Sequence, residues 1–181
     1  MMCWILLKSS TRTIRIDEVL DKLVEKSAND ESVSINFLVN KALQTYLEWN
    51  VVSRKFGLST IPRPLLNRFI DHHSENECKE LGHWVAKQSF KPFAEYQFGQ
   101  LTLQTSLEVF RRFAKYGGLY EFDAISDSHK LVIFLKHGSG LKWSIYYSSL
   151  IEAVYSEMLS RNVRIETTDD LCLSQIDLVV S

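Results

Sequence analysis

Residues 11–49 read TRTIRIDEVLDKLVEKSANDESVSINFLVNKALQTYLEW and carry three hydrophobic patterns in succession. The first is an alternation in which Ile14 and Ile16 face one side while Thr11, Thr13 and Arg15 face the other, which is the period of a β-strand. In the next two, apolar residues recur at the period of a helix. The segment therefore predicts a strand followed by two helices.

Polar residues mark the limits of the two helices. Asp17 offers a carboxylate that can cap the first helix, and Ser32 or Ser34 can cap the second. Asn29 begins a polar run that ends the first helix, and it tolerates a left-handed cap. The apolar positions are Val19, Leu20, Leu23 and Val24 in the first helix and Ile35, Leu38, Val39, Ala42, Leu43, Tyr46 and Leu47 in the second.

A segment of this size cannot form a core alone. It has too little volume to bury two apolar stripes, and an isolated strand leaves backbone groups unpaired on both edges. Two copies solve both problems, because the strands pair antiparallel and four helices share one core. We therefore expect an obligate homodimer, with a larger oligomer left open.

The same segment resembles the ribbon-helix-helix family of DNA-binding proteins, to which the Arc and methionine repressors belong. The resemblance implies that the paired strands enter the major groove of double-stranded DNA. The residues that read base edges would then be Thr11, Thr13 and Arg15. Their types suit this task, since Arg can fork onto guanine and Thr can contact the thymine methyl.

The resemblance also implies that amides at the start of the second helix hold a backbone phosphate, here at Ser32, Val33 and Ser34. The chain departs from the family where Asp30 and Glu31 replace the frequent glycine and place negative charge near that phosphate. A strand and two helices also occur within ordinary α+β cores, which is the alternative interpretation.

The bulk composition describes a soluble globular protein. The chain has 181 residues, 45% of them hydrophobic and 24% charged, enough for one ordinary domain or for a small domain joined to a medium one. Its net charge of −1 gives no overall basic surface. A nucleic-acid partner would therefore have to be bound by a local patch, in a salt-sensitive manner.

The helical pattern lapses after residue 50, where Gly57, Ser59, Thr60 and two prolines mark a boundary. We predict a DNA-binding domain at residues 1–50, a linker at 51–62 and an α+β domain at 63–181. The second domain is expected in the order ααα-ββ-α-ββ, with an antiparallel sheet. Its helices are expected near 64–71, 77–90, 103–113 and 143–159, and its hairpins at 120–125 with 131–135 and at 163–167 with 171–176.

Residues 136–158, KHGSGLKWSIYYSSLIEAVYSEM, resemble the poorly characterised C-terminal regions of small archaeal regulators. That resemblance implies an accessory domain and carries no functional residues across. Aromatic residues crowd this domain, and a cavity lined by them would bind a flat or apolar effector, whereas an exposed face of them would be an oligomer interface. The candidate pocket residues are Trp84, Trp143 and Tyr146.

Catalytic and metal-binding motifs are missing from the sequence. His73, Cys78 and His83 are spaced by five residues and do not share a helix face. Residues 137–140, HGSG, lack the rest of a phosphate-binding loop. We expect no enzymatic activity, no metal and no cofactor.

The cysteines and apolar runs indicate a cytoplasmic protein with no membrane partner. Cys3, Cys78 and Cys172 are widely spaced and odd in number, which is typical of free thiols in a reducing compartment. The apolar run at residues 2–7 is too short for a membrane span or a signal peptide.

Together these patterns predict a dimeric, sequence-specific DNA-binding transcriptional regulator, such as a repressor, with a C-terminal domain for ligand sensing or oligomerisation. The alternative is an antitoxin-like module that masks a partner protein. Antitoxins of this family usually carry a short, disorder-prone tail, whereas residues 63–181 are apolar and patterned. That difference favours the regulator.

Overall fold

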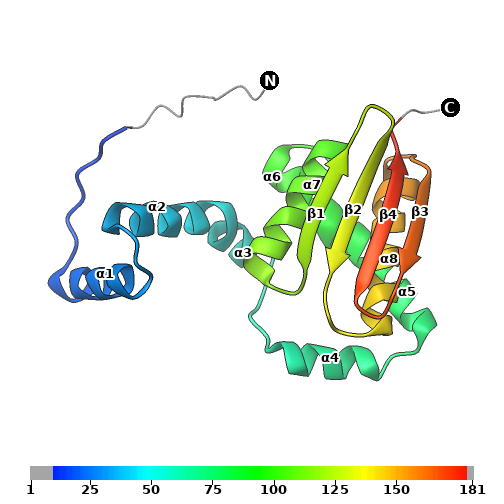
Figure 1. The fold of residues 1–181 in the computed structure, drawn as a ribbon, viewed down its shortest axis with the longest axis horizontal. Helices are drawn as coiled ribbons and strands as arrows, with labels where there is room; N and C mark the ends of the chain where they lie inside the picture. The colour runs from blue at the N-terminus through cyan, green and yellow to red at the C-terminus, as the bar shows by residue number, and fades with distance from the viewer. Residues whose placement is uncertain (1–9, 179–181) are drawn as a thin grey trace. The chain divides into compact units, whose positions relative to one another are not determined.

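The computed structural model describes residues 10–178, which form two compact units (Figure 1). The first unit is Met1–Gln44 and the second is Thr45–Ser181. The expected α+β class is confirmed, because helices accompany a four-stranded antiparallel sheet. The apolar run at residues 2–7 and Cys3 lie outside the described residues.

The first unit contains helices α1 (Glu18–Asp30) and α2 (Ile35–Thr45). The Asp17 carboxylate accepts a hydrogen bond from the Leu20 amide at 2.9 Å, so it caps α1 as predicted. The Ser34 hydroxyl accepts from the Phe37 amide at 3.1 Å and caps α2 in the same way. The left-handed residue between the helices is Ser32, with φ of 54°, in place of Asn29.

The predicted strand is not formed in the single chain, where residues 10–17 have no regular secondary structure. Its predicted core side chain, Ile14, is 59% exposed. The physical reason is that a strand needs a partner, and the folded part of this unit offers only helices. The two-stranded ribbon therefore stays a prediction about two copies.

Helical structure continues beyond the predicted domain boundary at residue 50. A π-helical segment, η1 (Tyr46–Asn50), leads into α3 (Val51–Lys55), so the first part of the expected linker at 51–62 is helical. The cause is burial: Val52 lies in the core of the second unit, and Trp49 and Phe56 pack against that core. Residues 58–62 lack regular secondary structure and lie within the second unit.

Between residue 63 and the sheet the second unit has four α-helices, where three were predicted, and the additional one is α6 (Lys91–Phe98). After α4 (Arg63–Asp71) comes α5 (Glu75–Val85), which begins with a capping box between Ser74 and Glu77. Helical structure continues past the predicted end at residue 90: a π-helical segment, η2 (Ala86–Phe90), precedes α6, and Pro92 lies in the first turn of α6. The half is completed by α7 (Leu103–Arg112) and η3 (Phe113–Gly117).

Both predicted hairpins are confirmed. They are β1 (Glu121–Ser126) with β2 (Lys130–Lys136), and β3 (Val163–Thr167) with β4 (Leu171–Asp177). The strands lie in the order β1-β2-β4-β3, so β2 and β4 pair in the centre and join the hairpins. Between the hairpins run α8 (Leu141–Glu152) and the π-helical segment η4 (Ala153–Met158), on the helical side of the sheet (Figure 1).

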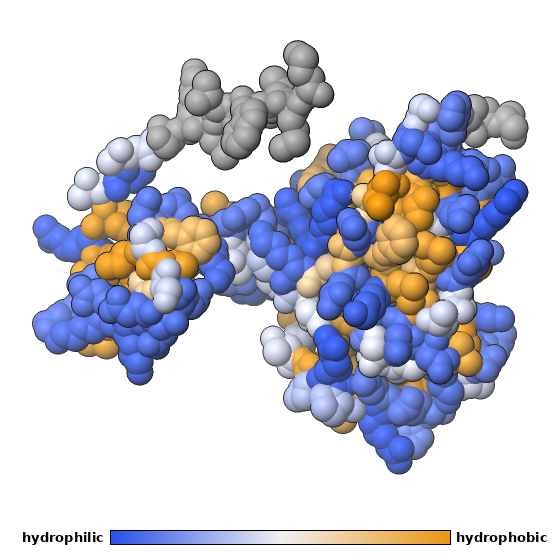
Figure 2. All heavy atoms as spheres, in the orientation of Figure 1, coloured by the Kyte–Doolittle hydropathy of each residue, from blue (hydrophilic) through white to orange (hydrophobic). Residues whose placement is uncertain are grey.

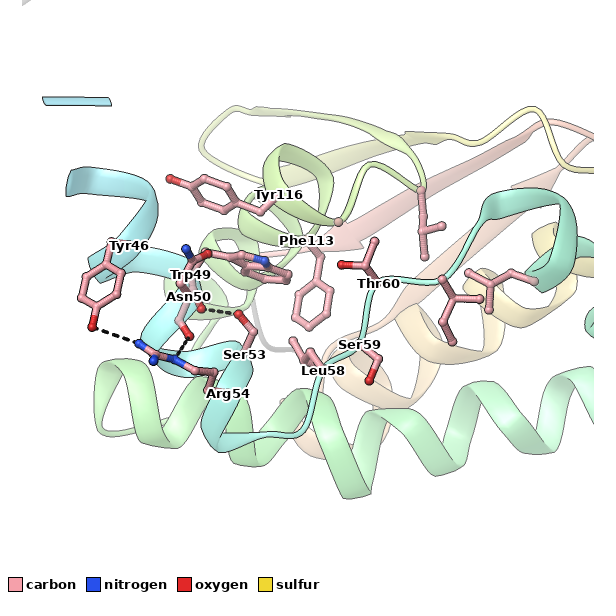
Figure 3. A pocket seen from close by; sticks show the side chains of 14 residues that line it. Tyr46, Trp49, Asn50, Ser53, Arg54, Leu58, Ser59, Thr60, Phe113 and Tyr116 are labelled. Atoms are coloured by element: carbon pink, nitrogen blue, oxygen red, sulfur yellow. Dashed lines mark hydrogen bonds between the residues drawn. The ribbon is translucent and has the colours of Figure 1, made fainter. Parts of the chain in front are cut away.

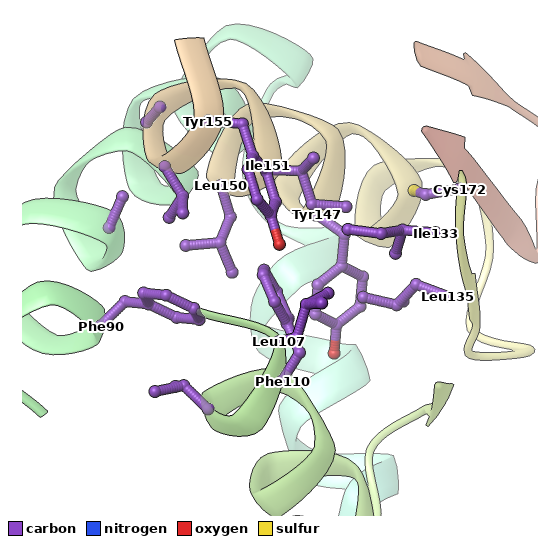
Figure 4. Packing of buried hydrophobic residues seen from close by; sticks show 14 of the residues in the cluster. Phe90, Leu107, Phe110, Ile133, Leu135, Tyr147, Leu150, Ile151, Tyr155 and Cys172 are labelled. Atoms are coloured by element: carbon purple, nitrogen blue, oxygen red, sulfur yellow. The ribbon is translucent and has the colours of Figure 1, made fainter. Parts of the chain in front are cut away.

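The core of the second unit lies between the sheet and its helices (Figure 4). Leu131, Ile133 and Leu135 alternate along β2 and are buried. Ile133 and Leu135 lie on the side of the sheet that carries Ile151 of α8 and Tyr155 of η4 (Figure 4). Burial of one such side chain contributes roughly 1.5–3 kcal/mol to stability. In residues 10–178 no helix combines the length and apolar character needed to cross a bilayer.

Candidate functional site

The three predicted base-reading residues, Thr11, Thr13 and Arg15, are all exposed and lie in the segment before α1 that has no regular secondary structure. None of them is needed for the packing of the first unit. Their role in base reading stays a prediction.

The turn between α1 and α2 uses two of the three amides that the family resemblance assigned to a phosphate. The Ser32 amide donates to the Asn29 carbonyl at 3.1 Å, and the Val33 amide donates to the Ala28 carbonyl at 2.9 Å. A phosphate would therefore have to share the amide hydrogens of Ser32 and Val33 with these carbonyls. The Ser34 amide is left as the best placed of the three to bind it. Glu31 forms an ion pair with Lys41 at 3.0 Å, which offsets the negative charge expected there.

The described part of the first unit leaves its large apolar side chains exposed or half-buried. Among residues 10–44 only Ala28 is buried. Figure 2 shows apolar side chains on the surface of this unit. The exposed large side chains are those of the predicted stripes, namely Val19, Leu20, Leu23, Ile35 and Leu43, together with Ile14 and Phe37.

The second unit contains an aromatic cavity of about 360 Å³. It lies between α4, α5, α7 and α8, and the π-helical segments η2 and η3 also contribute to its wall. Its size is within the range of small-molecule sites, near the lower end. The apolar lining residues are Leu66, Phe69, Ile70, Leu81, Val85, Phe90, Phe110, Phe113, Leu119, Tyr120, Trp143, Tyr146, Tyr147 and Leu150, and the polar ones are His73 and Ser89.

The tyrosine hydroxyls of the cavity wall are neutral. Burial raises the pKa of Tyr120, Tyr146 and Tyr147, so all three phenols stay protonated at neutral pH. Tyr120 donates to the Phe110 carbonyl at 3.1 Å. Within the described residues, Trp143 Nε1 and the Tyr147 hydroxyl are buried and have no hydrogen-bond partner.

Two of the three predicted pocket residues, Trp143 and Tyr146, line this cavity, and Trp84 does not. Trp84 is 59% exposed, because α5 turns Leu81 and Val85 toward the cavity and leaves Trp84 on another face. Tyr147 was not among the predicted residues. The signal that could have found it is its spacing of four from Trp143, which places both on one face of the helix.

A second concavity, of about 650 Å³, lies beside η1, α3 and residues 58–61 (Figure 3). It is more polar, and Arg54 is held at its wall by donating to the Tyr46 hydroxyl at 3.0 Å and the Asn50 carbonyl at 3.2 Å. Three side chains, those of Leu66, Phe113 and Leu119, line both this groove and the aromatic cavity. The two spaces are therefore neighbours.

The π-helical segment η1 is fastened to η3 by several contacts. The Trp49 ring lies 5.2 Å from Phe113 and stacks on Tyr116 at 5.5 Å between ring centroids. The Tyr116 hydroxyl donates to the Glu48 carboxylate at 2.7 Å, and Arg112 donates to the Glu48 carbonyl at 3.1 Å. A movement of the Phe113 ring in the cavity wall would therefore displace Trp49 of η1, which contacts it.

Over residues 10–178 no three His, Cys, Asp or Glu side chains are grouped so that they could hold a metal ion. No protein-family model matches the chain, and no curated protein sequence matches it. Among solved structures it is similar to a double variant of the Tt H-NOX protein, at 16% identity and a TM-score of 0.43. That alignment covers 76% of this chain and 87% of the other, and at such a score it carries no functional argument.

Proposed function

We propose that the protein is a dimeric, sequence-specific DNA-binding transcriptional regulator. In this proposal the first unit pairs with its copy to form a two-stranded ribbon that reads the major groove. The second unit senses a small molecule in the aromatic cavity.

The observation that carries the proposal is the poor burial of the first unit. Its helices have the predicted caps and stripes, yet Ala28 is the one buried residue among residues 10–44. Each large apolar side chain buried by a second copy would contribute roughly 1.5–3 kcal/mol. The same pairing would give the segment at residues 11–16 a strand partner, which it lacks in one chain.

The second unit favours a regulator over an antitoxin-like masking protein. Residues 45–178 form a folded α+β unit with a large apolar core and a ligand-sized cavity. A tail that folds only on a partner would have low hydrophobicity and no such core.

A ligand could act on DNA binding through η1. Phe113 belongs to the cavity wall and touches Trp49 of η1, and η1 follows α2 directly in the chain. For such a ligand to switch the protein, it must bind one arrangement of η1 and η3 more tightly than another. The ratio of the effector's affinities for the two arrangements therefore sets the largest change in DNA affinity that it can cause.

Selection of duplexes from a random DNA pool by the purified full chain tests the DNA-binding part. We expect enrichment of a site with two half-sites related by two-fold symmetry, because a symmetric dimer presents the same ribbon face twice. A pool that shows no enrichment after repeated rounds would remove DNA reading from the proposal and leave the masking alternative.

A further inference from the structure

We propose that the aromatic cavity binds a neutral, largely apolar molecule with one carbonyl oxygen, such as a ketone or an ester, and that Trp143 and Tyr147 donate hydrogen bonds to that oxygen. This inference rests on the sensing part of the proposed function and names its ligand class. It does not depend on DNA binding.

The two donors are the unusual feature of the cavity. Trp143 is 6% exposed and Tyr147 is 2% exposed, and their rings stack with centroids 5.5 Å apart. Neither Trp143 Nε1 nor the Tyr147 hydroxyl has a hydrogen-bond partner among the described residues. Both atoms are closed off from the open space of the cavity, so a ligand oxygen reaches them only when neighbouring side chains of the wall shift. A buried donor without a partner is destabilising, so such groups in folded proteins ordinarily serve a water, an ion or a ligand. The spacing of four residues places both on one face of α8.

The chemistry of these donors selects an acceptor. An indole N–H can only donate. The phenol of Tyr147 can donate and accept, and burial raises its pKa, so its proton is retained at neutral pH. Tyr120 already donates to the Phe110 carbonyl. Of the polar atoms on the cavity wall, Trp143 Nε1 and the Tyr147 hydroxyl are the ones that are buried without a partner among the described residues. A carbonyl oxygen, with two lone pairs, can accept from both donors at once.

The lining of the cavity selects a neutral molecule. Among the described residues that line it there is no Lys, Arg, Asp or Glu, and His73 is exposed. A charged ligand would lose its hydration without gaining a partner of opposite charge. The remainder of the wall is aromatic or aliphatic, so the body of the ligand is apolar.

The test uses Prodan, a naphthalene dye that carries a ketone, and its alkyl analogue in which a methylene group replaces the carbonyl. Binding of each to the full chain is measured by fluorescence titration. The variants are Trp143→Phe and Tyr147→Phe, which remove a donor and keep an aromatic ring. Trp84→Phe and Tyr96→Phe are the matched controls, since both residues are exposed and lie outside the cavity.

We expect Prodan to bind the wild-type chain about fivefold to tenfold more tightly than the alkyl analogue, the usual effect of a hydrogen bond. Trp143→Phe and Tyr147→Phe should each weaken Prodan binding and reduce that preference, while the controls retain both. The melting temperature of unliganded Tyr147→Phe should not fall, because the substitution removes a donor that has no partner. Equal wild-type affinities for the two dyes, no binding of either dye, or unchanged binding by both cavity variants would overturn the proposal.

Discussion

His137 is the residue at which the stability of the second unit should depend on pH. It is 4% exposed, its Nε2 lies 2.9 Å from Ser144 Oγ, and the Ser139 amide donates to its Nδ1 at 3.1 Å. Because Ser144 donates its own hydrogen to the Thr168 carbonyl, Nε2 carries the ring proton and the neutral imidazole is fully hydrogen-bonded. Burial lowers the pKa of His137 below its usual 6.5.

The sign of the pH effect follows from this lowered pKa. Below about pH 6.5 the unfolded chain takes up a proton at this site before the folded chain does. The stability contributed by neutral His137 is therefore complete above pH 6.5 and is lost as the pH falls toward the folded-state pKa. We expect the free energy of unfolding to decline by at most about 1.4 kcal/mol per pH unit, which is the slope when the unfolded state binds one proton more than the folded state. His137→Gln should remove that slope and the exposed His129→Gln should keep it, as measured by urea denaturation between pH 7.5 and 5.

A substitution at Arg15 tests DNA binding without disturbing folding. It is exposed and contributes nothing to the packing of the first unit, so Arg15→Ala should change stability by less than about 0.5 kcal/mol. If Arg15 forks onto guanine, the same change should weaken operator binding by roughly 1–3 kcal/mol per half-site and relax the preference for that base. Arg164→Ala, an equal change of charge on β3, is the control. Fluorescence anisotropy with operator and scrambled duplexes measures both, and unchanged operator affinity would exclude the ribbon face as the reading surface.

At the level of secondary structure, the second unit follows its sequence closely. The alternation in residues 120–135 and 163–176 and the turn residues between the strands are local signals, so both hairpins could be predicted. The sheet order could not, because the pairing of β2 with β4 joins residues about 40 positions apart through α8. The π-helical segments were also missed, since they arise from tertiary packing around residues such as Trp49 and Phe113.

The contact between α5 and α8 depends on Gly82. A methyl group at this position would lie 2.8 Å from Ser149 Cβ and would collide with the Tyr146 carbonyl. Overpacking of this kind costs typically 1–3 kcal/mol, which exceeds the 0.5–1 kcal/mol that alanine gains over glycine in a helix. We expect Gly82→Ala to be destabilising by about 1–3 kcal/mol. It should also weaken binding of an apolar dye, because Tyr146 and Leu150 line the cavity.

Gly117→Ala is the matched control for this prediction. The nearest atom to a methyl group at Gly117 is 4.0 Å away, so the substitution meets open space. Thermal unfolding followed by circular dichroism compares the two variants. A Gly82→Ala protein as stable as the wild type would show that α5 and α8 separate without loss, and that the close approach of the helices is not required.

At the scale of the whole molecule, the two units differ in how much apolar surface each can bury, and the sequence and the structure give the same reason. The second unit has enough residues to bury Phe93, Phe110 and Tyr155 completely. The first has the same kind of apolar stripes but too little structure to cover them. The cavity shows what the sequence cannot supply. Aromatic content suggested a pocket with Trp143, Tyr146 and Trp84, and the packing of α5 places Trp84 outside the cavity that Trp143 and Tyr146 line.

Dimerisation through the first unit is the prediction that connects its surface to its proposed function. Leu43 is 54% exposed in the single chain and lies in the stripe of α2 that a second copy would cover. Leu43→Asp would place an unpaired charge in that interface, at a cost of several kcal/mol. We expect the wild-type chain to sediment as a dimer and the variant to dissociate at least 100-fold more readily, since about 2.7 kcal/mol corresponds to that factor.

The control is Ile125→Asp, which places the same charge on a side chain that is 60% exposed in the second unit. It should leave the dimer intact, because Ile125 lies outside the stripes of the first unit. Leu43→Asp should keep the melting transition of the second unit, because among the described residues the buried core begins at Val52, with Trp49 packed against it, and Leu43 belongs to neither. A wild-type chain that stays monomeric at tens of micromolar, or a Leu43→Asp chain that stays dimeric, would contradict the ribbon-helix-helix interpretation, because a ribbon cannot form from a single strand.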